Sequence, residues 1–164
     1  MSRHRRGVTP ESPLTLFTRT AEVASENVIG SYSTSFGLAT RLLGKRHRSH
    51  VRNIYALVRV ADEIADGVAE EAGLSRAEQL EALRRYSAET SLAMRTGYSS
   101  DLVIHSFART AREAGIDETL TDPFFESMRT DLLDAGGRRV VFDRASHAAY
   151  VHGSAEVVGL MCLR

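Results

Sequence analysis

The segment YALVRVADEIADG, Tyr55–Gly67, places two aspartates four residues apart in a stretch that is otherwise mostly apolar. At about 100° per residue, Tyr55, Arg59, Asp62 and Asp66 fall within an arc of roughly 60° on a helix. A neighbouring arc of roughly 120° holds the apolar residues Ile54, Leu57, Val58, Ala61, Ile64, Ala65 and Val68. The segment therefore predicts an amphipathic helix whose acidic stripe runs beside its core-facing surface.

Helical periodicity continues on both sides of this segment, and strand patterns are nearly missing, which predicts an all-α protein. Ser75 and Glu78 form a capping box at a helix start, and Gly97 marks the end of that helix. Asp122 followed by Pro123 predicts another start. We expect helices over about 14–29, 47–66, 76–96, 100–115 and 122–135, and from 144 onward.

Composition limits the classes of protein that the chain can represent. Its 164 residues, 43% of them apolar, predict a flexible tail over 1–12 and a single domain over 13–164. Basic and acidic residues both number 21, so a nucleic-acid partner is not expected, although RHRR and KRHRSH form local basic clusters. One cysteine, Cys162, excludes an internal disulfide. We expect a cytoplasmic protein, in contact with a membrane at most peripherally.

The acidic stripe has two interpretations. Asp62 and Asp66, one turn apart, can each give an oxygen to Mg²⁺, which typically completes its coordination with waters and substrate phosphates. Arg59 would add forked donors for phosphate, and Tyr55 a hydroxyl or an aromatic face. Alternatively, Arg59 forms ordinary surface ion pairs with Asp62 and Glu63 on a solvated helix. The spacing alone leaves both interpretations open.

Three motifs in order carry a resemblance: SYSTSFGLATRLL (31–43), IYALVRVADEIADG (54–67) and YVHGSAEVVGLMC (150–162). Together they resemble the first half of the squalene/phytoene synthase family, and most of all bacterial phytoene synthases. The resemblance implies an all-helical isoprenoid synthase fold around a deep cavity. It also implies head-to-head condensation of two prenyl diphosphates, assisted by Mg²⁺ or Mn²⁺, in carotenoid or related isoprenoid biosynthesis. In phytoene synthases the substrate is geranylgeranyl diphosphate.

The same resemblance implies roles for individual positions. Asp62 and Asp66 match the family's first aspartate-rich motif, which holds metal ions that bridge to the diphosphate, although many relatives carry a second aspartate where this chain has Glu63. The other positions that match residues lining the substrate site are Ser33, Ser35, Phe36, Tyr55, Arg59, Tyr150, Val158 and Gly159.

Several of these residues have a structural alternative. Ser33 and Ser35 fit as helix-capping hydroxyls. Phe36 and Val158 fit as core residues, and Gly159 fits as a point of close helix packing. These alternatives remain open beside the substrate-binding roles.

The other polar residues give weaker indications of a functional role. Glu156 lies on an apolar helix and either faces solvent or joins a polar cavity wall. A surface role is the default for Asp131 and Asp134. The remaining polar candidates, which show no metal-ligand spacing, are His105, His147 and His152.

The family's second aspartate-rich motif, of the N-x-x-x-D-x-x-x-D kind, does not occur in this sequence. We therefore expect an N-terminal part of the enzyme, inactive alone, that exposes apolar faces and associates with itself or with a complementing C-terminal chain. A non-enzymatic helical interaction module is the alternative. Prenyl chain length, the choice among phytoene, dehydrosqualene and squalene, and use of a nicotinamide cofactor cannot be read from the residues.

Overall fold

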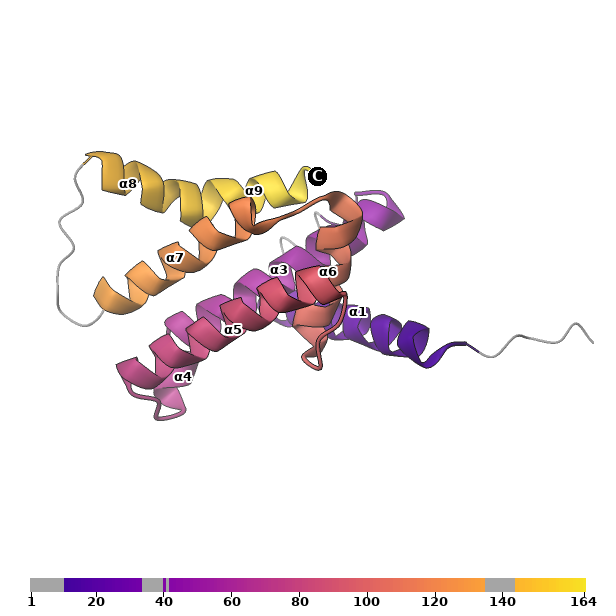
Figure 1. Ribbon diagram of the computed structural model, residues 1–164, viewed down its shortest axis with the longest axis horizontal. Coiled ribbons are helices and arrows are strands. Elements are labelled where there is room, and N and C mark those ends of the chain that lie inside the picture. The colour runs from indigo at the N-terminus through magenta and orange to yellow at the C-terminus, as the bar shows by residue number, and fades with distance from the viewer. Residues whose placement is uncertain (1–10, 34–39, 41, 135–143) are drawn as a thin grey trace, which may run out of the picture.

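The structure is a computed structural model that describes residues 11–33, 40, 42–134 and 144–164, and within them every regular element is helical. Figure 1 shows their arrangement, with α7 lying beside the run from α8 to α9. None of these helices combines the length and the apolarity needed to cross a bilayer. The elements are α1 (Pro13–Tyr32), α3 (Lys45–Ala65), α4 (Val68–Glu71), α5 (Arg76–Thr96), α6 (Leu102–Ala114), α7 (Glu118–Asp134), α8 (Arg144–Val151), a π-helix η1 (His152–Glu156) and α9 (Val157–Cys162).

Helix α3, which contains the acidic stripe, is the central element of the fold. It packs against α1, α5, α6, α7 and α9. The core side predicted from its sequence is confirmed, since Ile54, Leu57 and Ala61 are buried, whereas Val68 lies beyond the helix and is exposed. The buried side chains that meet this surface include Leu83 of α5, Phe107 of α6, Phe124 and Leu132 of α7, and Val157 and Met161 of α9.

Local sequence signals account for several helix ends. In α5, the Ser75 hydroxyl accepts from the Glu78 N–H and the Glu78 carboxylate accepts from the Ser75 N–H, which confirms the capping box. Gly97 ends that helix at φ +82°, a conformation that other residues rarely adopt. The first helix differs from expectation, because it continues through Gly30 to Tyr32.

The predicted start of the fifth helix at Asp122 is wrong. Helix α7 begins at Glu118, one turn earlier, and Pro123 lies inside it. The cause is Asp117, whose carboxylate accepts from the Thr119 N–H at 3.0 Å and so satisfies a free donor of the first turn. Pro123, the sixth residue of α7, has no N–H to donate within the helix, and the helix nevertheless continues past it.

Helices α8 and α9 are joined by the π-helical turn η1, which packs against α7. Gly153, at the centre of that contact, approaches α7 so closely that an added Cβ would lie 2.3 Å from the carbonyl oxygen of Pro123. Only glycine fits there without a shift of the backbone. Gly159 is different, because a Cβ on it would meet nothing within 4 Å.

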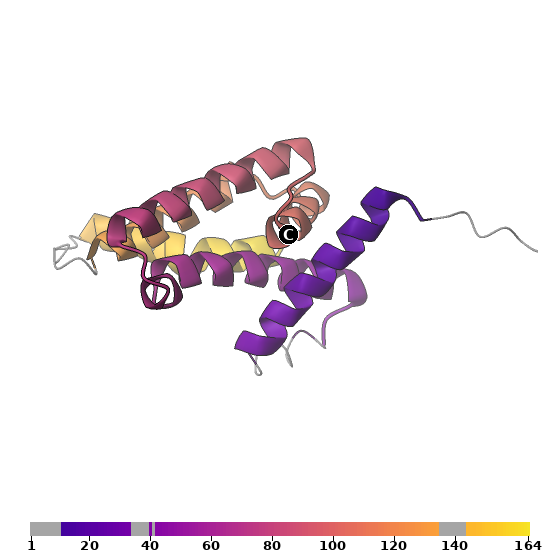
Figure 2. The ribbon, with the colours of Figure 1, turned by 90° about the horizontal axis from the view of Figure 1, so that it is seen from below.

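Helix α1 crosses α3, as Figure 2 shows, and polar contacts with α6 help to hold it. The Thr18 hydroxyl lies 3.0 Å from Nε2 of His105, and the hydroxyls of Ser25 and Ser106 are 2.7 Å apart. All four residues are buried. A buried polar group without a hydrogen-bond partner raises the free energy of the folded state. These two pairs therefore favour the position of α1 in which both are formed.

Candidate functional site

Helix α3 supplies the residues of the acidic stripe, but the helix ends within the stripe. Its last helical residue is Ala65, and Asp66 is the C-cap with φ −135° and ψ 99°. The Asp66 N–H donates to the carbonyl oxygen of Asp62 at 2.6 Å. Asp66 therefore leaves the helical path that the sequence predicts for it, and it is more exposed than Asp62.

Both aspartates nevertheless line one cavity, of about 460 Å³. Helix α3 forms one wall of the cavity, and α7 and α8 form the other. Arg59, Asp62 and Asp66 of the stripe thus face a hollow between helices, whereas the alternative interpretation placed them on a solvated surface. The lining residues are Arg59, Asp62, Ala65, Asp66, Met128, Asp131 and Tyr150.

Asp131 belongs to this cavity, although the sequence assigned it a surface role by default. It is half-buried on α7, and its Oδ1 accepts a hydrogen bond of 2.8 Å from the Tyr150 hydroxyl. At about 100° per residue, Asp131 falls inside the arc that Phe124 and Ser127 define on α7, both of which are buried. A carboxylate on that arc needs a polar partner. The position of Asp131 on this arc was therefore a sequence signal that its carboxylate is sheltered and paired.

Burial and the charges around the cavity change the ionisation of Asp62. Burial is the largest influence and raises the pKa of Asp62 from 3.8 to about 6. The Arg59 guanidinium opposes that rise, whereas the negative charge of Asp131 adds to it, as do those of Glu63 and Asp66. An acid in this state gains from a cation placed beside it, because the cation would lower the free energy of the charged form.

Arg59 is held on more than one side. Its guanidinium forms an ion pair with the Glu63 carboxylate, one turn along α3, and its Cζ lies 4.5 Å from the centroid of the Tyr32 ring. The side chains of Arg59 and Glu63 are 34% and 14% exposed, so the pair is more sheltered than an ordinary surface bridge. The Nε of Arg59 is buried and has no hydrogen-bond partner among the described residues.

The other positions implied by the resemblance lie in different surroundings. Ser33 is half-buried at the C-cap of α1, and its N–H donates to the carbonyl of Ile29 at 3.0 Å. Ser35 and Phe36 lie outside the described residues. Tyr55 is half-buried on α3, Val158 packs partly buried against the core, and Gly159 is exposed. These three do not line the cavity described above. The open surroundings of Gly159 contradict the alternative of close helix packing there.

Two residues left open by the sequence now have partners. Glu156 is exposed and pairs with Nδ1 of His152 at 2.9 Å, so it faces solvent and not the cavity. His105 is buried, and its ring stands nearly perpendicular to that of Phe17, with centroids 4.9 Å apart.

The donor set of the cavity fits a metal ion only when a second component completes the coordination. Among the residues that the structure describes, no group of three or more histidine, cysteine or acidic side chains could hold a metal ion by itself. Mg²⁺ usually takes only one or two carboxylates and fills its octahedron with waters and substrate phosphates. Asp62, Asp66 and Asp131 on one cavity therefore suit an ion shared with a phosphate-bearing ligand.

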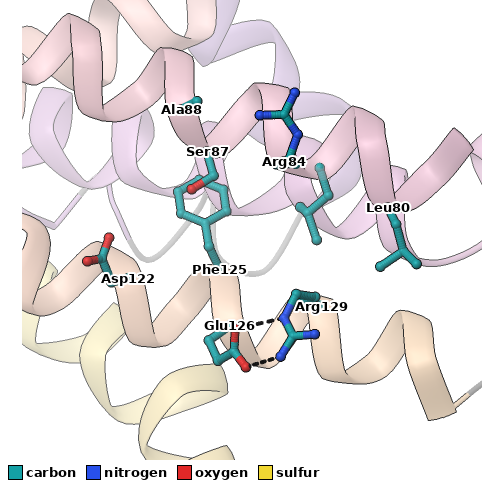
Figure 3. Close-up of a pocket in the computed structure, with 9 residues that line it drawn as sticks. Leu80, Arg84, Ser87, Ala88, Asp122, Phe125, Glu126 and Arg129 are labelled. Carbon is teal, nitrogen blue, oxygen red and sulfur yellow. Dashed lines mark hydrogen bonds and ion pairs between the residues drawn. The ribbon is translucent and has the colours of Figure 1, made fainter. Parts of the chain in front are cut away.

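A second hollow, of about 380 Å³, lies between α5 and α7 (Figure 3). Leu80, Leu83 and Phe125 contribute to its lining, and most of its charged neighbours are paired. Arg129 binds Glu126 on the rim, as the dashed lines show, and Arg84 binds Glu81 at 2.7 Å. The groove is mostly apolar and, among the described residues that line it, only Asp122 is a carboxylate without an ion pair, so it gathers no cluster of carboxylates like that of the first cavity.

Comparison with known proteins agrees with this architecture. The family model for squalene/phytoene synthase matches residues 29–164, whereas no curated protein sequence matches the chain significantly. A crystal structure of a dehydrosqualene synthase in complex with ligand superposes with a TM-score of 0.71 at 24% identity, covering 93% of this chain and 49% of that chain.

The family match spans most of the chain, and the chain belongs to the squalene/phytoene synthase family. Its fold is the helical isoprenoid synthase fold of the dehydrosqualene synthase. The helical periodicity predicted an all-α protein, and the resemblance of the three motifs implied this particular fold. The chain spans about half the length of that solved neighbour.

Proposed function

We propose that the protein containing this chain joins two prenyl diphosphates head to head, with phytoene formed from geranylgeranyl diphosphate as the first choice of product. The observation that carries the proposal is the meeting of Asp62, Asp66 and Asp131 with Arg59 around one cavity. Carboxylates together with a forked cation are the groups expected around a metal-bound diphosphate. Dehydrosqualene or squalene synthesis is the alternative, and it differs in prenyl chain length or in a reductive step.

The site residues divide the task between the two ends of the substrate. Departure of diphosphate from an allylic carbon leaves a carbocation, so one end must stabilise an anion and the other must exclude water. Arg59 would donate to the diphosphate oxygens. Asp62 and Asp66 would hold Mg²⁺ or Mn²⁺, which would neutralise charge on the leaving group when bound. Tyr55 and Phe36 would border the hydrocarbon chain, where aromatic faces tolerate positive charge.

The chain spans about half the length of the solved neighbour, and this affects whether it can be active alone. Three acidic side chains on one cavity support a shared ion but no metal cage within the described residues. We propose that this chain does not turn over substrate alone and gains activity only with the remaining half of the family fold, in the same chain or in a second one. Its long-chain substrate makes contact with a membrane surface an expected property of the assembled enzyme.

Substitution in an enzyme that contains this chain together with the rest of the fold tests the proposal. Asp62→Asn and Asp66→Asn each remove one charged ligand while preserving size, and we expect both to lower condensation of geranylgeranyl diphosphate by at least about a hundredfold with helicity unchanged. Asp122→Asn is the control, because Asp122 is exposed on α7 and lines the other hollow. Near-normal turnover in Asp62→Asn would refute the metal role.

A non-enzymatic helical interaction module is the second candidate function. It is favoured by large apolar side chains exposed on α7, α8 and α9, namely Leu133, Val151 and Leu160. The two candidates separate on one measurement, which is whether a chain carrying the rest of the family fold restores condensation when mixed with this one. Restoration supports the enzyme, and stable binding without activity supports the module.

A further inference from the structure

Tyr32, the last residue of α1, does not line the cavity but contacts a residue that does. Its ring lies under the guanidinium of Arg59, with 4.5 Å between Cζ and the ring centroid. Arg59 comes from α3 and does line the cavity, so this contact joins two helices at the edge of the site. The Tyr32 residue is 50% exposed, which means that packing in the core is not the reason for its position.

The two partners of Arg59 constrain different parts of its guanidinium. An aromatic ring under the group contacts its face and leaves the N–H donors in the plane of the group. Glu63 takes a terminal nitrogen in that plane. The Nε stays buried with no hydrogen-bond partner among the described residues. A donor in that state favours an acceptor that arrives with a ligand, because the unmade hydrogen bond costs free energy.

The position of the Tyr32 ring is itself determined by the fold. Helix α1 is docked by the buried pairs Thr18 with His105 and Ser25 with Ser106, which lie further back along the same helix. Because these bonds are directional, they limit sliding and rotation of α1. The ring is therefore presented to Arg59 from a rigid element, which is what a supporting residue requires.

We propose that Tyr32 is a positioning residue that, together with Glu63, holds the Arg59 guanidinium so that its remaining in-plane donors meet an oxygen of the diphosphate. The proposal rests on the proposed function for the identity of the anion. It assigns Tyr32 no contact with substrate. Tyr32 acts through Arg59 alone.

The test uses the 164-residue chain and variants that separate the ring from its hydroxyl. Tyr32→Leu removes the ring, Tyr32→Phe keeps it, and Leu92→Ala shortens an apolar side chain of similar exposure on α5. The Arg59 Nε–Hε resonance, identified by its loss in Arg59→Lys, reports ring stacking by NMR. Titration with inorganic pyrophosphate and Mg²⁺ then reports anion binding, and circular dichroism checks the helical fold of each variant.

We expect Tyr32→Leu to move the Arg59 resonance and to weaken pyrophosphate binding by about two- to fivefold, as loss of a partly exposed cation–π contact would do. Tyr32→Phe and Leu92→Ala should match the wild type in both measurements. The proposal would be overturned if the Arg59 resonance had the same chemical shift in Tyr32→Leu as in the wild type, or if that variant bound pyrophosphate with unchanged affinity. Pyrophosphate that leaves the wild-type Arg59 resonance unmoved would instead refute the proposed anion site, even if the resonance still depended on the ring.

Discussion

Asp62 experiences three influences on its charge at once, namely partial burial, an attractive guanidinium and neighbouring carboxylates. Burial dominates, which is why its pKa rises to about 6 in the folded chain. A residue in this position is a poor isolated anion and a good cation ligand, since the ion would offset the free-energy cost of a partly buried negative charge. The same reasoning explains why Asp131, which adds repulsion, is compatible with a functional cavity.

The raised pKa has a testable sign. A carboxyl group whose pKa is higher in the folded state favours folding when protonated, and this contribution is lost as the pH rises from about 4 through about 6. Without metal, Asp62→Asn should therefore match the wild type in free energy of unfolding below about pH 4. Above about pH 7 it should be more stable by roughly 1 kcal/mol, a figure that allows for solvent screening of a partly exposed group.

Urea denaturation in the presence of a chelator, at both pH values, measures this difference. Asp122→Asn serves as the control for a surface aspartate. A stability difference between Asp62→Asn and wild type that is the same in acid and at neutral pH would contradict the assignment.

The sequence predicted those site residues whose relation lies within one helix. Arg59 and Asp62 share a face because of helical periodicity alone. The helical pattern of α7 indicated that Asp131 is sheltered but not that it meets Tyr150, which comes from another helix 19 residues later. The role of Tyr32 was not predicted for the same reason, since Tyr32 contacts Arg59 only after α1 docks on α3.

At the scale of helices, local capping chemistry decided which boundaries could be predicted. The limits of α5 were predicted because Ser75, Glu78 and Gly97 encode both ends. The start of α7 was not, because the Asp122–Pro123 signal competed with a stronger cap at Asp117. The π-helical turn η1 carries no sequence signature that we recognised, and its setting depends on the contact between Gly153 and Pro123.

The two glycines of the last helical run should respond oppositely to alanine. Gly153→Ala places a methyl group 2.3 Å from the Pro123 carbonyl oxygen, so we expect a loss of about 1–3 kcal/mol in the free energy of unfolding. Gly159→Ala meets open space in a helix, and we expect a gain of up to about 1 kcal/mol. Thermal and urea denaturation of both variants measures the contrast. Equal effects of the two substitutions would show that the close contact does not determine the stability of this region.

At the scale of the whole molecule, the chain combines a well-packed centre with exposed apolar side chains toward its C-terminal helices. Leu133, Val151, Leu160 and Leu163 are 41%, 38%, 44% and 83% exposed. Side chains of this kind favour association when they gather on one surface. If the proposed function holds, these side chains are a surface on which the other half of the family fold would pack.

We predict that the isolated chain self-associates as its concentration rises. Replacing Leu160 and Leu163 by serine should shift the association to at least severalfold higher concentration, because it removes apolar area that contact would bury. Sedimentation velocity over a range of concentrations measures the change. Leu16→Ser, on the exposed side of α1, is the control for a general gain in solubility. A monomer at every concentration would contradict the prediction.

The hydroxyl pairs that dock α1 have one further consequence. A displacement of this helix along its axis by one turn, about 5.4 Å, would separate Thr18 from His105 and Ser25 from Ser106 while moving Tyr32 away from Arg59. Apolar surfaces tolerate such slippage far better than paired hydroxyls do. The two pairs thus determine the position of α1 along its axis. Substitutions at Thr18 or Ser25 would therefore also affect Arg59, although neither residue contacts it directly.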